Sequence, residues 1–338
     1  MDKQKLLSKI ALSACFFALC VIGLGAFTRL IDAGLGCPDW PGCYGHLTLP
    51  LSQSSEIMQN PGYVSYKAWA EMIHRYAVSG LSVFIISIIL LTFSFKSLRI
   101  RKNIIASFLL IALLVYQIIL GQLTVTLKLI PIIVTQHLLG GFLIISTLWF
   151  IYLMNRNQNT DITSLKNRTL LLTMSMIGLV IILTQIFLGA WTSTNYASLS
   201  CPDFPLCMNN QIQQFHFKEA FTFLSPIGVN YEGGVLSESA RQTIQMVHRI
   251  GALCVTVYLI ILMMVAFPRV QNNVSLLKPL YLLMGLLSIQ LCLGMANVLF
   301  KLPLITAISH NLTAVLLLLC TLTLVYNLLL TSRKVSVS

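Results

Sequence analysis

Residues 25–43 read GAFTRLIDAGLGCPDWPGC, and residues 189–207 read GAWTSTNYASLSCPDFPLC. The two stretches align without a gap at an offset of 164 residues, and each begins near the end of a long apolar segment. Farther along, Gln117 matches Gln290 at an offset of 173 residues. The second half of the chain therefore repeats the first.

The chain is far more apolar than a water-soluble domain. Of its 338 residues, 57% are hydrophobic and only 9% are charged, whereas a soluble domain carries about 25% charged residues. Continuous apolar runs of about 20 residues predict membrane-spanning helices rather than the alternating strands of a barrel. Eight such runs are expected, at 10–30, 69–95, 104–126, 134–154, 169–192, 243–267, 278–299 and 306–330.

The repeat and the eight segments together predict the fold class. It is an all-α integral membrane protein whose eight transmembrane helices form two four-helix-bundle repeats, residues 1–160 and 161–338, with polar Thr160–Thr163 in the linker. Because each repeat has an even number of helices, both repeats should have the same orientation in the membrane, as parallel repeats. The first segment resembles a signal peptide, but no clear small-residue cleavage site follows it and the repeat pairs it with an internal segment, so we expect it to stay as a helix.

The net charge of +12 is concentrated on one side of the predicted helices. The positive-inside rule makes that side cytoplasmic. We therefore expect a protein of the bacterial inner membrane with both termini in the cytoplasm. This placement favours topology and contact with the lipid bilayer over nucleic-acid binding. The basic residues on that side are Lys3, Lys5, Lys9, Lys96, Arg99, Arg101, Lys102, Arg156, Lys166, Arg168, Arg269, Lys278, Arg333 and Lys334.

Two cysteine pairs lie in the loops predicted on the outer side. Cys37 and Cys43, and likewise Cys201 and Cys207, are spaced C-x5-C in an oxidising compartment, which predicts a disulfide in each loop. Zinc binding is the competing interpretation, although no further ligands lie near. A redox-active role for one pair is a third alternative.

Four histidines occupy matching positions at the starts of apolar segments. They are His74, His137, His248 and His310, one pair in each repeat at similar depth near the outer leaflet. An ionisable residue inside a membrane is costly and marks a functional site by default. Two imidazoles on neighbouring helices can bind one heme iron axially, so the pattern predicts two heme sites. Satisfied interhelical histidines, or a copper or zinc site, are the alternatives.

Two unpaired histidines carry no such prediction. His46 and His216 lie in outer loops without a partner in the other repeat, and we expect them to be ordinary surface residues.

The two repeats differ beside the first histidine. Glu71 lies three residues before His74, whereas Gln245 occupies the matching position before His248. A carboxylate can move protons or stabilise a developing cation, so Glu71 is the candidate catalytic residue. Capping of its helix or pairing with Arg75 is the structural alternative. Arg75 and Arg249 are candidate contacts for heme propionates, with snorkelling to the interface as the alternative.

Taken together, these motifs resemble the heme A synthase family over nearly the whole chain. The features that carry the resemblance are E-x-x-H-R at residues 71–75, the other three histidines, the paired outer cysteines, and TRL-x-x-x-G-L-G-CPDWPGCYG from Thr28. The resemblance implies an oxidoreductase that oxidises a methyl group of heme O to a formyl group, giving heme A for terminal oxidases. It further implies that His74 and His137 bind the iron of substrate heme O, and that His248 and His310 bind a heme b cofactor. Glu71 would be catalytic, and the pair formed by Cys37 and Cys43 would be the one implicated in redox function.

Two other functions compete with this one. A di-heme b-type electron-transfer protein, such as a quinol oxidoreductase, explains the four histidines but neither Glu71 nor the outer cysteines. A parallel-repeat heme transporter would give exchangeable heme and no formyl product. Pathway logic adds a heme O synthase as partner; the electron acceptor, the mechanism of oxygen insertion and a homo-oligomeric state stay open.

Overall fold

The computed structural model describes residues 2–48, 63–156, 165, 167–208 and 214–331. Its eight long helices are α1 Lys3–Leu30, α2 Ser65–Ser94, α3 Arg101–Thr126, α4 Pro131–Asn155, α5 Arg168–Thr194, α7 Glu238–Val270, α8 Val274–Leu299 and α9 Leu304–Leu330. All eight are long and apolar enough to cross a membrane. The prediction of an all-helical protein with eight spanning helices is thus confirmed over the described residues, in which the β-structure is an isolated bridge between Cys43 and His46.

Helices α1, α7 and α8 begin before the apolar runs that predicted them, because capping residues start them in polar sequence. Asp2 accepts a hydrogen bond from the Gln4 amide at 3.0 Å, so α1 begins well before the run at 10–30. Ser237 caps α7 in the same way. Two short elements were not predicted: η2, Lys96–Leu98, and α6, Phe217–Ala220.

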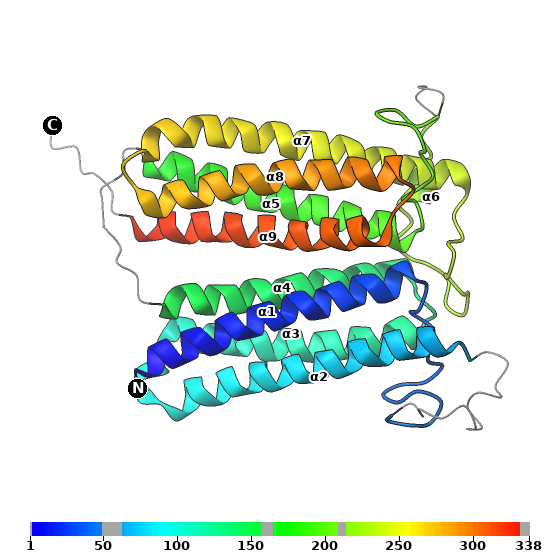
Figure 1. Cartoon of the computed structure of the whole chain (residues 1–338), viewed down its shortest axis with the longest axis horizontal. Helices are drawn as coiled ribbons and strands as arrows, with labels where there is room; N and C mark the ends of the chain where they lie inside the picture. Colours follow the sequence, from blue (N-terminus) through cyan, green and yellow to red (C-terminus); the bar gives the residue numbers. More distant parts are fainter. Residues whose placement is uncertain (1, 49–62, 157–164, 166, 209–213, 332–338) are drawn as a thin grey trace.

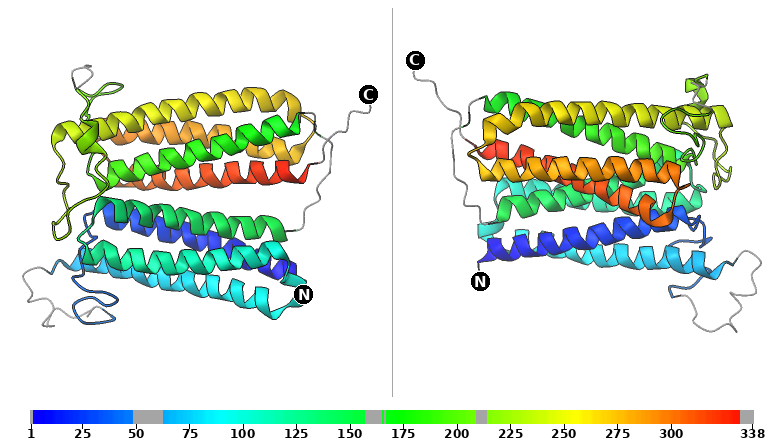
Figure 2. Two further views of the ribbon diagram at one scale, coloured as in Figure 1. Left: turned by 180° about the vertical axis from the view of Figure 1, so that it is seen from behind. Right: turned by 45° about the horizontal axis from the view of Figure 1, so that its top comes forward.

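The long helices lie in two groups (Figure 1). The N-terminal group is α1 to α4, and the C-terminal group is α5, α7, α8 and α9; the view from behind shows the same division (Figure 2). Leu110, Ile145 and Leu283 are among the fully buried residues of the core between helices, while Val83, Leu90 and Met264 face outward. A helix that is apolar on all sides suits a membrane, since its outer face then contacts lipid.

The same unusual backbone conformation recurs in both halves of the chain. Lys128 and Leu129, between α3 and α4, have φ of 50° and 63°, and Lys301 and Leu302, between α8 and α9, have φ of 56° and 62°. The left-handed region costs a residue with a side chain about 1–2 kcal/mol. Its recurrence at matched positions supports the repeat, while the parallel-repeat arrangement and the boundary at residues 160 and 161 stay predictions.

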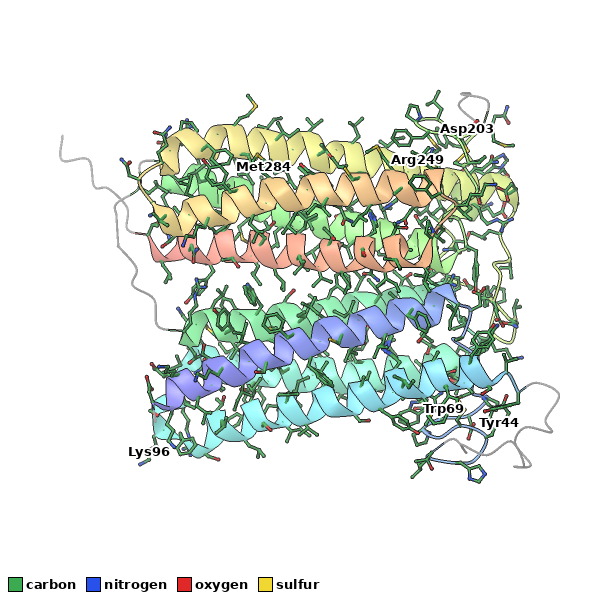
Figure 3. All side chains as sticks on the ribbon, viewed as in Figure 1. Tyr44, Trp69, Lys96, Asp203, Arg249 and Met284 are labelled. Atoms are coloured by element: carbon green, nitrogen blue, oxygen red, sulfur yellow. A yellow bond between two sulfur atoms is a disulfide. The ribbon has the colours of Figure 1, made fainter. Side chains whose placement is uncertain are left out.

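The two ends of the bundle differ in character. The start of α1 lies at the same end as Lys96, while Tyr44, Trp69, Asp203 and Arg249 lie at the opposite end (Figure 3). The disulfide loops are therefore on the side away from the N-terminus, as the topology predicts. The predicted linker Thr160–Thr163 and the basic residues Lys166, Arg333 and Lys334 lie outside the described residues.

Candidate functional site

The structure brings the histidines together in the predicted pairs. His74 on α2 and His137 on α4 are close enough to interact electrostatically. His248 on α7 and His310 on α9 interact in the same way. Each pair joins two helices of a single group, so each group contains one candidate two-imidazole site.

Each of the four imidazoles lies against a glycine of another helix. A Cβ atom built on the glycine would meet the ring Cε1 at 3.0–3.5 Å in all four places. At the tightest of these distances the ring must shift to admit even a methyl group. The pairs are Gly25 with His74, Gly121 with His137, Gly189 with His248, and Gly294 with His310. These glycine contacts were not predicted from the sequence.

The histidine nitrogens are incompletely paired. Nδ1 of His74, His137 and His310 is buried without a hydrogen-bond partner. Buried polar atoms are nearly always satisfied, and the exceptions often mark a place that a ligand or ion completes. Half-buried paired imidazoles with unsatisfied nitrogens, packed on glycines, fit the axial ligation of an iron macrocycle.

Three buried or half-buried amides accompany the histidines. Gln290 Nε2 lies 3.2 Å from His310 Nε2, and Gln185 Nε2 lies 3.0 Å from His248 Nδ1. Gln117, the repeat counterpart of Gln290, has a buried Nε2 without a partner. Gln185 was not among the predicted site residues, although a lone amide within the apolar run LVIILTQIFLG indicates a functional position.

Glu71 connects the first histidine site to the first disulfide loop. Its Oε2 accepts a hydrogen bond from the Cys37 amide at 2.9 Å, and its Oε1 pairs with Arg75. The residue is 6% exposed, so this carboxylate is held in a nearly closed environment. The ion pair that the sequence analysis named as the structural alternative is therefore present, and the catalytic role of Glu71 stays a prediction.

The arginines that follow His74 and His248 hold the disulfide loops. Arg75 donates to the carbonyls of Asp39, Pro41 and Gly42. Arg249 donates to the Cys201 carbonyl at 2.6 Å and to the Asp203 carbonyl at 2.7 Å. Both guanidinium groups thus tie a loop to the helix that carries a histidine; their contact with heme propionates stays a prediction.

The cysteine pairs are both disulfides. Cys37 is bonded to Cys43 and Cys201 to Cys207. The disulfide prediction is confirmed, and the zinc interpretation is not retained. A redox-active role for one of these disulfides stays a prediction.

The first disulfide loop is partly packed, with Cys37 and Cys43 buried and Trp40 and Leu47 exposed. Asp39 accepts hydrogen bonds from the Tyr44 amide at 2.6 Å and the Gly45 amide at 2.8 Å. Burial raises the pKa of the Tyr44 hydroxyl above its usual value, and the nearby Tyr63, Asp39 and Glu71 raise it further. The loop therefore forms a partly desolvated, acidic cover beside Glu71. His46 and His216 are exposed, as expected for surface residues.

Fold and site together define a class: an eight-helix membrane protein with one imidazole pair in each four-helix group and a disulfide-closed loop above each pair. The chain belongs to the COX15-CtaA family of cytochrome oxidase assembly proteins, whose family model matches residues 8–322.

Individual relatives agree with this assignment. A protein of Shewanella oneidensis named heme A synthase is 42% identical over 318 residues, covering 92% of this chain and 93% of its own. A heme A synthase of Wolbachia pipientis is 30% identical and covers 88% of this chain and 90% of its own. A heme A synthase of Rickettsia canadensis is 27% identical and covers 94% of this chain and 96% of its own.

Proposed function

We propose that this chain is a heme A synthase, an oxidoreductase of the bacterial inner membrane that converts heme O to heme A. The observation that carries the proposal is the pairing of His74 with His137 and of His248 with His310 in a chain similar to heme A synthases over more than nine-tenths of its length. Both termini are cytoplasmic in this proposal, supported by the basic residues at one end and the disulfides at the other.

The two groups take different roles in the proposed function. His74 and His137 bind the iron of substrate heme O, and His248 and His310 bind heme b. Heme b, when bound, supplies an iron that accepts and passes on single electrons. The Glu71 carboxylate, present only in the N-terminal group, supports this division, because Gln245 at the matching position cannot accept a proton at neutral pH.

The position of Glu71 supports a role as a base in this reaction. Oxidation of a methyl to a formyl group adds an oxygen atom to the carbon and releases protons as well as electrons, so a nearby base that accepts a proton would speed the reaction. Glu71 precedes His74 by three residues and so projects from about the same side of α2. Arg75 and the Cys37 amide hold its two oxygens in place, and the disulfide loop above them limits access of water.

The outer position of the sites also suits the substrate. Heme O carries a long isoprenoid tail, which can extend into the surrounding lipid from a site formed between membrane-spanning helices. The four glycines leave room for the imidazole rings between the helices, since side chains at those positions would press on the rings.

The test is analysis of hemes extracted after co-expression with a source of heme O. A synthase yields a formyl-bearing heme, and the double variant His74→Ala, His137→Ala serves as the inactive control. Unchanged hemes from the wild-type protein, with both sites loaded, would instead select the di-heme electron-transfer protein.

A further inference from the structure

A segment of the C-terminal half crosses the outer end of the bundle and packs on the N-terminal group. This crossing segment, residues 226–234, lies between α6 and α7 (Figure 1). The Tyr231 amide donates to the Lys128 carbonyl at 3.1 Å, and the Tyr231 side chain is buried in a cluster that includes Ile130. The segment is therefore fixed beside the start of α4, the helix that carries His137.

The crossing segment also reaches α2, the helix that carries His74. The carboxylate of Glu232 pairs with the Lys67 ammonium group at 3.3 Å. Lys67 is seven residues before His74. At the start of α4, Ile130 is likewise seven residues before His137. Seven residues are two turns, about 10 Å along a helix, so the segment joins both helices at one level, outward of the first histidine pair.

Lys67 shares a helix face with the residues proposed for the reaction. Residues spaced i, i+4 and i+7 project from one side of a helix, and Lys67, Glu71 and His74 have this spacing on α2. The Glu71 carboxylate is held by Arg75 and the Cys37 amide, so it does not compete for the ammonium group. Lys67 therefore places a cation on the histidine side of α2, and its partner comes from the other half of the chain.

The C-terminal group has a cation at the matched position. Arg241 is seven residues before His248 and so matches Lys67. It pairs with Glu238 of its own helix at 2.7 Å, and its Nε is buried without a hydrogen-bond partner. A basic residue two turns outward of the first histidine is thus common to both groups. Its carboxylate partner lies on a separate segment in the N-terminal group and on the same helix in the C-terminal group.

The carboxylates of a heme explain a cation at this level. A heme carries its propionate groups on one edge, and an ionised carboxylate is costly in the hydrocarbon region of a membrane. That edge should therefore face the outer end of the site. An ammonium group stabilises a carboxylate through a charge-assisted hydrogen bond, and Glu232 already offers Lys67 the chemical group that a propionate would offer.

We propose that Lys67 binds a propionate carboxylate of the substrate heme, and that Glu232 is an internal anion that pairs with Lys67 until the substrate displaces it. The two side chains are 24% and 30% exposed, so they can separate without unpacking the core. The inference rests on the proposed function, because it takes His74 and His137 as the ligands of heme O. It adds a residue of the C-terminal half to the substrate site of the N-terminal half.

Hemin binding to the N-terminal group tests the proposal. Full-length protein with His248→Ala and His310→Ala is titrated with hemin, which confines binding to the first site. Lys67→Gln should weaken binding about 10-fold, the effect of losing one charge-assisted hydrogen bond. Glu232→Gln should strengthen binding about 2- to 5-fold, because it removes a competitor held by a partly exposed ion pair. Lys301→Gln is the matched control, since it removes one positive charge from an exposed position between α8 and α9.

Hemin dimethyl ester separates a carboxylate contact from a change in structure. The ester has no ionised propionate, so Lys67→Gln should bind it as tightly as the parent protein does, and Lys67→Arg should keep hemin binding. If the ion pair only fastens the crossing segment, Lys67→Gln and Glu232→Gln both break it, and both should change hemin binding in the same direction.

The results distinguish the inference from the proposed function on which it rests. Unchanged hemin affinity in Lys67→Gln and Glu232→Gln, or a shift in the same direction in both, would overturn the inference, provided that His74→Ala still abolishes binding. Unchanged binding of hemin by His74→Ala would instead overturn the assigned ligand and with it that part of the proposed function.

Discussion

At the residue scale, the difference between Glu71 and Gln245 separates the two histidine sites. Both side chains are almost fully buried, at 6% and 4% exposed. Glu71 is satisfied by Arg75 and the Cys37 amide, whereas Gln245 Oε1 has no partner. A well-held carboxylate in one site and an unsatisfied amide in the other support chemistry in the N-terminal group.

Glu71→Gln makes the first site resemble the second and tests this assignment. It keeps the size of the side chain but removes the charge, so heme A formation should fall by about 100-fold or more. Heme b at His248 and His310 should persist, because that site is in the other group. Extraction of the hemes measures the amounts of both heme A and heme b. Undiminished heme A from the variant would show that the role of Glu71 is structural.

The glycine contacts give a second prediction at this scale. Gly189→Ala places a methyl group 3.1 Å from His248 Cε1 and should weaken heme binding in the C-terminal group. Gly285→Ala is the control, since nothing lies within 4 Å of its Cβ position. Alanine favours a helix over glycine by about 1 kcal/mol in both variants. Equal heme content after titration with hemin would show that the ring contact has no effect.

At the scale of elements, each disulfide loop is bound to the helix that carries a histidine. Arg249 donates to three carbonyls between Asp203 and Leu206 and to the Cys201 carbonyl. Arg75 makes the equivalent bonds to the first loop. The arginines and disulfides together stabilise two covers at the outer end of the bundle.

Cys201→Ser with Cys207→Ser should mainly lower stability. Removing a disulfide from a small extracellular unit costs about 2–5 kcal/mol, so thermal unfolding in detergent should shift downward. Thiol labelling of unreduced, denatured wild-type protein should modify Cys15 and Cys320 but not the disulfide cysteines. Full labelling of Cys201 and Cys207 without reductant would contradict the structural role.

We expect the N-terminus of α7 to depend on pH through Glu219. Its carboxylate accepts hydrogen bonds from the Ser237 amide and hydroxyl, both at 2.7 Å. These bonds lower the pKa of Glu219. The stabilisation from these two hydrogen bonds is fully present when the pH is above the pKa of Glu219 in the unfolded chain, about 4.3. It is lost as the pH falls through the lower pKa that Glu219 has in the folded protein. Hydrogen-exchange protection at Ser237 should drop below about pH 4, and Glu219→Gln should remove that dependence.

At the scale of the whole molecule, one contact between the two groups joins matched positions at and just after the ends of α1 and α5. The Arg29 guanidinium lies 3.9 Å from the centre of the Tyr196 ring, and the Tyr196 hydroxyl donates to Asp32 at 2.9 Å. Asp32 and Tyr196 occupy equivalent places in the repeat. This junction therefore lies where a symmetry axis between the repeats would pass.

Arg29→Leu should loosen this junction. It removes the ring contact and a hydrogen bond to the Ser193 carbonyl, a loss of about 1–3 kcal/mol. Arg269→Leu is the control, because Arg269 is exposed and donates to a carbonyl of its own helix. Thermal unfolding should separate the variants, and equal stability would show that other contacts hold the groups together.

The sequence by itself was enough to predict the eight helices, the two disulfides and the placement of the four histidines on their helices. These follow from local properties: an apolar run of about 20 residues must satisfy its backbone internally in lipid, and a close cysteine pair in an oxidising compartment forms a bond. The repeat then predicted the pairing of His74 with His137 and of His248 with His310. Both histidines of a pair lie near the start of helices that run in the same direction, so the sequence alone places them at the same depth.

The tertiary structure alone decided which groups contact the histidines. Gln185 and His248 are 63 residues apart, and Glu71 meets the amide of Cys37 across two elements. The arginines predicted to contact heme propionates donate to carbonyls of the disulfide loops, a contact that the sequence did not predict. Such contacts depend on how helices rotate and pack against one another, and a pattern of apolar residues around a whole helix does not specify that rotation.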